Sequence, residues 1–148
     1  MKKNKINGFN ENQIFQLYAY LVAYEESGIE KYESTKALLN EHPELAIIGQ
    51  TAKPVICHKS SNQDMKEIDF KVLTNEIYLT KNKGNLLLSF LAHLRNSIAH
   101  GNIEDHEGRV WVTDYANPQY NPVDFTARGC IDFDVINSIT KALKQIVL

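Results

Sequence analysis

Residues 86–101 carry the pattern that most constrains how this chain folds. At about 100° per residue, four apolar side chains share one narrow arc of a helix, which predicts an amphipathic helix facing a hydrophobic core: Leu87, Leu91, Leu94 and Ile98. Gly101 follows this run, and a left-handed glycine commonly ends a helix. We therefore expect a core-forming helix that ends at Gly101.

The opposite arc of the same helix is polar: Ser89, His93, Asn96, Ser97 and His100. Arg95 lies at the edge of the apolar arc. Such groups are costly to bury without partners, so two interpretations stay open. The polar residues form a functional site, or Arg95 pairs with a carboxylate such as Glu25 or Asp114 while His100 caps carbonyls at the helix end.

Residues 95–100 read Arg-Asn-Ser-Ile-Ala-His and resemble the Arg-polar-x-x-x-His signature of the HEPN superfamily. The trailing Ala99-His100-Gly101 also resembles the usual form of that motif. HEPN proteins are small and helical. Many are metal-independent ribonucleases, often toxins or antiviral factors, and others only bind RNA or a nucleotide.

The resemblance implies a mainly α fold, an antiparallel helical bundle with a small β-hairpin insert before the last helix. It covers residues 1–148 as a single HEPN-like domain, with residues 1–8 flexible and the insert at about 107–131. It also implies a homodimer in which two copies of the motif form one composite site. The implied function is RNA cleavage in phage defence or a toxin–antitoxin system; the alternative is a non-catalytic module that binds RNA, a nucleotide or a protein.

Metal-independent RNA cleavage needs a base for the 2′-hydroxyl, a cation for the phosphate and a group that orients the attack. Histidine titrates near neutral pH and suits the first task. The arginine fork suits the second, and asparagine orients by hydrogen bonding. By resemblance we assign these roles to His100, Arg95 and Asn96. On an ideal helix Arg95 and His100 point about 140° apart, so either the long arginine reaches around the helix or a second chain completes the site.

Four further residues are expected to bind substrate: His93, Ser97, Arg109 and Arg128. His93 and Ser97 share the polar arc of the helix, where the alternative for His93 is a partly exposed histidine with no role. All three arginines of the chain follow residue 94. Arginine is the better bidentate phosphate ligand, so this distribution favours a phosphate site near the motif.

Composition excludes some classes of protein. The net charge is −2 over 148 residues, which argues against a general nucleic-acid coat but not against RNA bound at one cleft. The two cysteines, Cys57 and Cys130, lack Cys-x-x-Cys spacing and are expected to be reduced thiols of a cytoplasmic protein. No signal peptide or membrane span is expected.

Cofactor and partner expectations follow from the same residues. The spacing of His100, Asp105 and His106 matches no metal-binding pattern, so no metal and no cofactor is expected. The expected partners are a second copy of the chain and an RNA substrate, together with an antitoxin protein if the chain acts as a toxin.

The remaining elements are predicted from caps and periodicity. A first helix begins after Asn10, with Gln13 as its capping-box partner, and ends at Gly28. A second helix covers residues 29–39 and stops before Pro43. Residues 65–80 favour a helix.

The last third of the chain alternates between turn signals and apolar periodicity. Residues 109–113 and 124–131 predict paired strands, with Trp111 covering the core. Asp132 is placed to cap a last helix, whose apolar residues recur at helical spacing: Phe133, Ile136, Ile139, Leu143 and Ile146.

Overall fold

The computed structural model describes residues 8–43, 56–59, 75–80, 86–117 and 121–147. Its helices are α1 (Glu11–Ser27), α2 (Thr35–Glu41), α4 (Leu86–Ala99) and α5 (Phe133–Val147), with a short 3-10 helix η1 (Ile29–Lys31). Its strands are β1 (Ile56–Lys59), β2 (Glu76–Leu79), β3 (Ile103–His106), β4 (Arg109–Asn117) and β5 (Asn121–Asp132).

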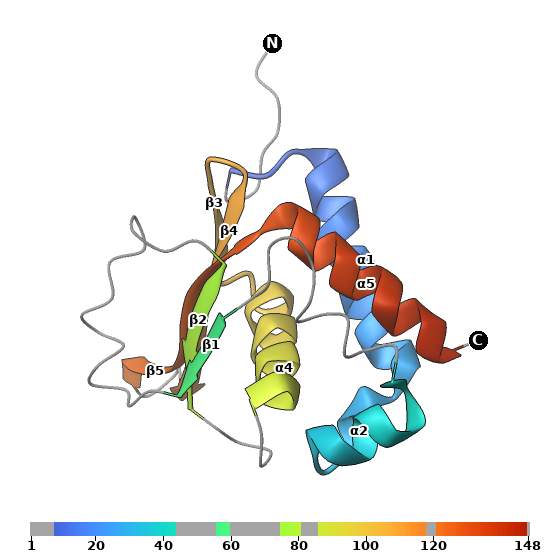
Figure 1. Cartoon of the computed structure of the whole chain (residues 1–148). Helices are drawn as coiled ribbons and strands as arrows, with labels where there is room; N and C mark the ends of the chain where they lie inside the picture. The colour runs from blue at the N-terminus through green and yellow to red at the C-terminus, as the bar shows by residue number, and fades with distance from the viewer. Residues whose placement is uncertain (1–7, 44–55, 60–74, 81–85, 118–120, 148) are drawn as a thin grey trace.

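The strands form one five-stranded mixed sheet in the order β1-β2-β5-β4-β3. The β1–β2 pair is parallel and the other pairs are antiparallel. The described helices cover one face of this sheet in two layers (Figure 1). Helix α4 lies directly on the sheet, and α1 and α5 pack against each other beyond it. We call the face that α4 covers the inner face and the opposite one the outer face.

The expected helical bundle with a small hairpin is wrong, because a whole sheet forms one wall of the core. The predicted hairpin is present as β4 and β5, but β2 and β3 extend it on both sides. Residues 76–79, expected to be helical, form β2, in which Ile77 and Leu79 are buried and alternate with half-buried residues. A strand of four residues is too short for its period of two to be separated from a helical pattern. Residues 65–74 of that predicted helix, like residues 1–7, lie outside the described part.

Helix α1 begins and ends as predicted. Asn10 and Gln13 form the capping box, in which the side chain of Asn10 accepts from the Gln13 N–H at 2.9 Å and that of Gln13 accepts from the Asn10 N–H at 3.0 Å. Gly28 closes the helix in the left-handed conformation.

The second predicted helix is wrong in its continuity. It divides into η1 and α2, because the side chain of Ser34 accepts from the Ala37 N–H at 3.1 Å and so starts a new helix. Helix α2 ends at Glu41, just before Pro43, as predicted.

The core joins all three layers. Helix α5 buries four of the five apolar residues predicted for it and half-buries Ile146, and Phe133 packs edge-to-face on Phe9 at 6.0 Å between ring centroids. The Tyr20 hydroxyl of α1 donates to the Leu91 carbonyl oxygen of α4 at 2.6 Å, which satisfies a fully buried polar group. Among the described helices, none combines the length and apolar content that crossing a bilayer requires.

Candidate functional site

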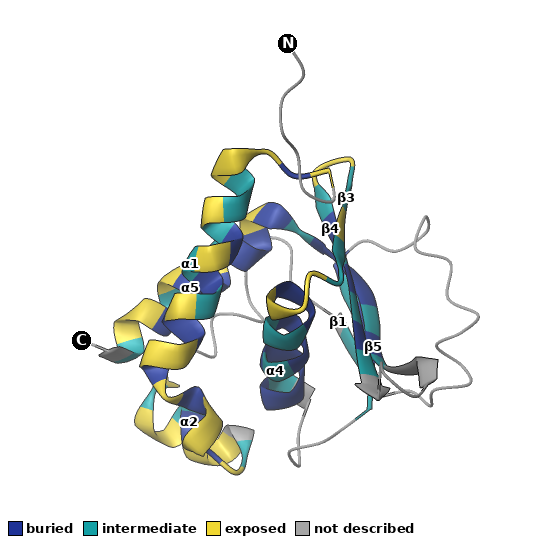
Figure 2. Cartoon of the chain, turned by 180° about the vertical axis from the view of Figure 1, so that it is seen from behind, coloured by how far each residue is buried: buried dark blue, intermediate teal, exposed yellow. Residues whose placement is uncertain are grey.

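Helix α4 is buried on both of its arcs. On the apolar arc Leu91, Leu94 and Ile98 lie in the core. On the polar arc Ser89 and Ser97 are fully buried too, because α4 lies between the sheet and α1. Among residues 87–99 of this helix, whose burial is described, only the C-terminal Ala99 is exposed, where the chain turns toward β3 (Figure 2). Polar side chains of α4 therefore need partners from the sheet or from α1.

Asp114 of β4 supplies such a partner from the inner face of the sheet. Its Oδ2 lies 2.8 Å from Nδ1 of His93, and the two side chains are 6% and 3% exposed. The same oxygen accepts from Nδ2 of Asn96 at 3.2 Å, and Oδ1 accepts from the Tyr115 N–H at 3.0 Å. A buried carboxylate is stable only with such a set of donors, so this cluster fixes α4 to β4.

His93, expected to bind substrate, thus lies in the interior behind the motif. Ser97, expected to do the same, donates its hydroxyl to the His93 carbonyl oxygen at 2.9 Å within α4. Nε2 of His93 is buried and has no hydrogen-bond partner among the described residues.

Arg95 extends the polar contacts from the core to the surface. One guanidinium nitrogen donates to Oδ1 of Asn96 at 3.1 Å and another to Oε1 of Glu25 at 3.2 Å. The side chains of Arg95 and Glu25 are 33% and 59% exposed, so their ion pair is weak. The contacts run from Asp114 through Asn96 to Arg95, and they hold a cation at the edge of α1 and α4.

The charge of Arg95 also reaches the neighbouring tyrosines of α1. Burial raises the pKa of Tyr20 well above its ordinary value, and the field of Arg95 acts in the opposite direction. Tyr24 shows the same balance, with its pKa raised by burial and opposed by Arg95. Both phenols stay neutral at physiological pH, so neither competes with Glu25 for the guanidinium.

His100 lies exposed where α4 ends. The helix closes with a Schellman motif, in which the Gly101 N–H donates to the Ile98 carbonyl oxygen at 3.1 Å and the Asn102 N–H to that of Ser97 at 2.8 Å. Gly101 has φ 72°, as predicted for the residue that ends this helix. The backbone therefore caps these carbonyls, and the imidazole of His100 is not needed for that purpose.

The structure brings together only some of the residues predicted for the site. Arg95 and Asn96 lie on the last turns of α4 and His100 directly follows the helix, with Asp114 bonded to Asn96 from behind. Arg109 and Arg128 occupy outer-face positions of β4 and β5, because they alternate with the buried Val110 and Ala127. The sequence left Glu25 and Asp114 as alternative partners of Arg95. In the structure Arg95 pairs with Glu25, whereas Asp114 binds Asn96 and His93.

Metal chemistry has no candidate ligand set in the described part of the chain. No three His, Cys, Asp or Glu side chains gather there in a way that could hold an ion.

Comparison with known proteins identifies the family. A family model described as HEPN pEK499 p136 matches residues 1–146, which is nearly the whole chain. No curated protein and no solved structure matches. The match agrees with the resemblance drawn from residues 95–100 and assigns no role to any single residue. The chain belongs to the HEPN pEK499 p136 family.

Proposed function

We propose that this HEPN protein is a metal-independent endoribonuclease whose active site comprises Arg95, Asn96 and His100. The observation that carries the proposal is the contact chain from buried Asp114 through Asn96 to half-exposed Arg95. A cation fixed from behind and open in front is pre-organised for a phosphate, which is the arrangement that electrostatic catalysis requires. His100 stands exposed one helical turn beyond Asn96.

The reaction needs no oxidant or metal. His100 removes the proton of a 2′-hydroxyl, the 2′-oxygen attacks the adjacent phosphorus, and the bond to the 5′-oxygen breaks. Arg95 neutralises the charge that builds on the phosphate oxygens. The departing 5′-oxygen takes a proton from solvent or from the imidazole of a second copy, which leaves a 2′,3′-cyclic phosphate and a 5′-hydroxyl end.

Substrate binding displaces Glu25 in this mechanism. Because the Glu25–Arg95 pair is exposed, breaking it costs less than about 1 kcal/mol. The phosphate then takes the place of the carboxylate, while the bond from Arg95 to Asn96 keeps the guanidinium in position.

A homodimer completes the proposal. Phe15, Tyr18 and Val22 of α1 are 73%, 62% and 50% exposed, and they follow one helical stripe that continues to Glu25. An exposed apolar stripe of this kind marks an interaction surface. Its continuation into the partner of Arg95 would bring two motifs together, as in the HEPN ribonucleases that this chain resembles.

Tyr18→Glu tests the dimer, because it places a charge in the apolar stripe without touching the core. We expect the wild type to sediment as a dimer and the variant as a monomer with strongly reduced RNA cleavage. Lys36→Glu, an exposed position on α2, is the matched control and should leave the mass unchanged. A wild type that stays monomeric at all concentrations would contradict the dimer.

The test of the activity is a digest of RNA and of DNA of the same sequence, each with and without EDTA. We expect cleavage of RNA alone, at the same rate with the chelator, and cyclic-phosphate ends by mass spectrometry. Cleavage of DNA, or loss of activity in EDTA, would overturn the mechanism. The cellular role that follows is phage defence or a toxin–antitoxin system, and growth arrest on expression, relieved by an antitoxin, would support it.

A second candidate is a non-catalytic RNA-binding module. One observation favours it over catalysis: in the free protein Glu25 already engages Arg95, the cation that would neutralise the phosphate. Tight binding of RNA by the pure wild type, without any product after long incubation, would select this function over the first.

A further inference from the structure

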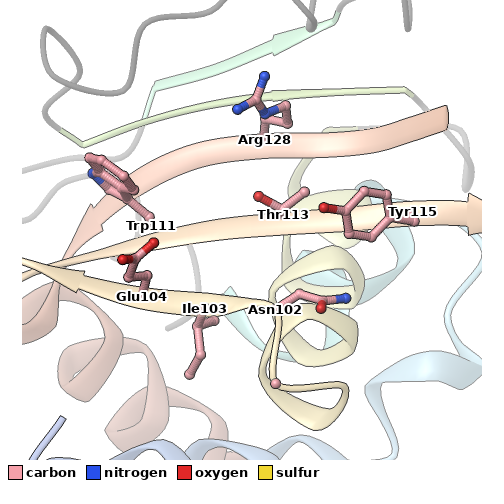
Figure 3. Close-up of a pocket in the computed structure, with 8 residues that line it drawn as sticks. Asn102, Ile103, Glu104, Trp111, Thr113, Tyr115 and Arg128 are labelled. Atoms are coloured by element: carbon pink, nitrogen blue, oxygen red, sulfur yellow. The ribbon is translucent and has the colours of Figure 1, made fainter. Parts of the chain in front are cut away.

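The outer face of the sheet carries a pocket of about 540 Å³, a size typical of small-molecule sites (Figure 3). Alternate residues of β4 form its floor: Trp111, Thr113 and Tyr115. Asn102 and Glu104 line the β3 side, and Arg128 lines the β5 side. Trp111 is therefore not the cover of the core that its hairpin position predicted. The pocket also reaches Gly101, the residue after His100.

Strand register fixes how the charges are arranged. Arg128 lies opposite Thr113 across β5 and β4, and Glu104 lies opposite Trp111 across β3 and β4. Directly opposed side chains are about 5 Å apart, and next-but-one residues along a strand about 7 Å. The guanidinium and the carboxylate thus stand on opposite sides of an aromatic floor, as the sticks in Figure 3 show.

Arg128 is well suited to an anion. Its side chain is half-buried, and burial lowers its pKa from the ordinary value, while the nearby Tyr115 acts in the other direction. An arginine stays protonated under such a shift. A guanidinium that is already partly dehydrated has less water to lose when it binds a phosphate, so its net interaction with the phosphate is stronger than that of a fully hydrated cation.

Each chemical group of the pocket matches one part of a nucleotide. The ring of Trp111 packs against His106 on one side, with the ring centroids 4.4 Å apart, and its other side can stack on a base, whatever its sequence. The Arg128 fork binds phosphate oxygens. The exposed carboxylate of Glu104 accepts hydrogen bonds from base N–H groups, and guanine presents two such donors, N1–H and N2–H, on one edge.

We propose that this pocket binds one guanine nucleotide of a single-stranded RNA, with the base on Trp111, its N–H edge on Glu104 and a phosphate on Arg128, which leaves Tyr115 at the far end of the pocket for an adjacent nucleotide. The proposal rests on the proposed function, because the pocket begins at the residue after His100 and would select where the RNA is cut. Beyond Arg128 the sheet continues to Tyr78 of β2, whose ring stacks on His58 at 4.4 Å and 15°. A neighbouring nucleotide finds a further aromatic surface there.

The chain contains one tryptophan, so its intrinsic fluorescence reports this pocket directly. The test titrates full-length His100→Ala protein, which prevents turnover, with GMP, IMP, AMP, CMP, UMP and inorganic phosphate. We expect saturable quenching by GMP and none by phosphate alone. IMP, which lacks the N2 amine, should bind about tenfold more weakly, because one hydrogen bond to a charged acceptor is lost.

Two variants separate the roles of the charges. Arg128→Gln should weaken GMP about tenfold or more and leave guanosine unaffected, because only the phosphate contact is lost. Glu104→Gln should remove the preference for GMP over IMP. Lys141→Gln is the matched control, since it removes an exposed cation of α5 that does not line this pocket. Circular dichroism confirms that each variant is folded.

A short RNA with one guanine separates RNA from a free nucleotide. Tighter binding of the RNA than of GMP, and weaker binding when adenine replaces its guanine, support the proposal. If the pocket binds GMP more tightly than the guanine-containing RNA, the assignment of RNA as its ligand is wrong. The absence of quenching by every nucleotide, or equal quenching in all variants, would overturn the pocket itself. These results are independent of cleavage, so the failure of either proposal leaves the other to be judged on its own assay.

Discussion

Two histidines, one within α4 and one directly after it, lie in opposite environments. His93 is 3% exposed and pairs with Asp114, whereas His100, about two turns later, stands exposed at the helix end. The difference comes from what lies beside each turn, the sheet beside His93 and the chain reversal at Gly101 beside His100. A buried, paired imidazole orders its surroundings, and an exposed one is available for proton transfer.

The same division separates the other polar residues of the helix. Asp114 and Ser97 belong with His93 in the interior, and Arg95 faces solvent with His100. Asn96 joins the two groups, because it donates to Asp114 and accepts from Arg95. Interior substitutions should therefore change stability first, and substitutions on the open side should change cleavage first.

The largest expected effect is on the interior side. Asp114→Ala leaves the imidazole of His93, the amide of Asn96 and the Tyr115 N–H without their acceptor. We expect the free energy of unfolding to fall by about 3–5 kcal/mol, measured by urea denaturation. Asp134→Ala, which removes an exposed carboxylate from the first turn of α5, is the control and should cost no more than about 1 kcal/mol. Equal losses of unfolding free energy in the two variants would contradict the special role of the buried Asp114.

On the open side, Arg95→Ala should lower the RNA cleavage rate about a hundredfold, since a preorganised cation is lost at the phosphate. Its unfolding free energy should change by less than about 1 kcal/mol, because only an exposed ion pair and one amide contact disappear. Arg95→Lys should recover part of the rate. An Arg95→Ala variant with a much lower unfolding free energy but an unchanged specific activity would show that Arg95 belongs to the interior side.

Glu25→Gln should have a smaller effect. The substitution removes the charge that holds Arg95 in the free protein, and we expect a loss of about 0.5 kcal/mol or less in unfolding free energy. Cleavage should be retained with an equal or lower KM, because the phosphate no longer competes with a carboxylate. If cleavage fell as far as in Arg95→Ala, the ion pair itself would be needed for activity.

The smallest effect concerns Cys130, which is sealed in the sheet. Burial raises the pKa of its thiol from 9.0 to about 11. Between these values the native thiol keeps a proton that the unfolded chain has lost, so this group lowers stability as pH rises through that range. At pH 8 a thiol reagent should modify it at least about tenfold more slowly in native Cys57→Ser protein than in urea. Equal rates would show that the site is open.

Local signals in the sequence predicted the helices well where caps were present. Asn10, Gln13 and Gly28 define α1 by hydrogen bonds within a few residues, and Gly101 ends α4 in the same way. The sheet could not be predicted in this manner. Strands β1 and β2 have four residues each, and β2 is held by pairing with β5, some fifty residues later. A pairing over that distance leaves no local pattern.

The candidate site shows the same limit. The motif at residues 95–100 was visible in the sequence, and so were Glu25 and Asp114 as acceptors. Which acceptor serves which donor depends on β4 lying across α4, and sequence spacing does not contain that information. The outer-face pocket was missed because Trp111, Glu104 and Arg128 come from three strands whose register only the folded sheet defines.

The most direct test of the whole account is the single-turnover rate of RNA cleavage by His100→Ala beside that of the wild type, both in EDTA and both checked by thermal unfolding. We expect a rate about a thousandfold lower with an unchanged unfolding midpoint, because the imidazole is exposed and acts in proton transfer. A variant that cleaves RNA as fast as the wild type would contradict it.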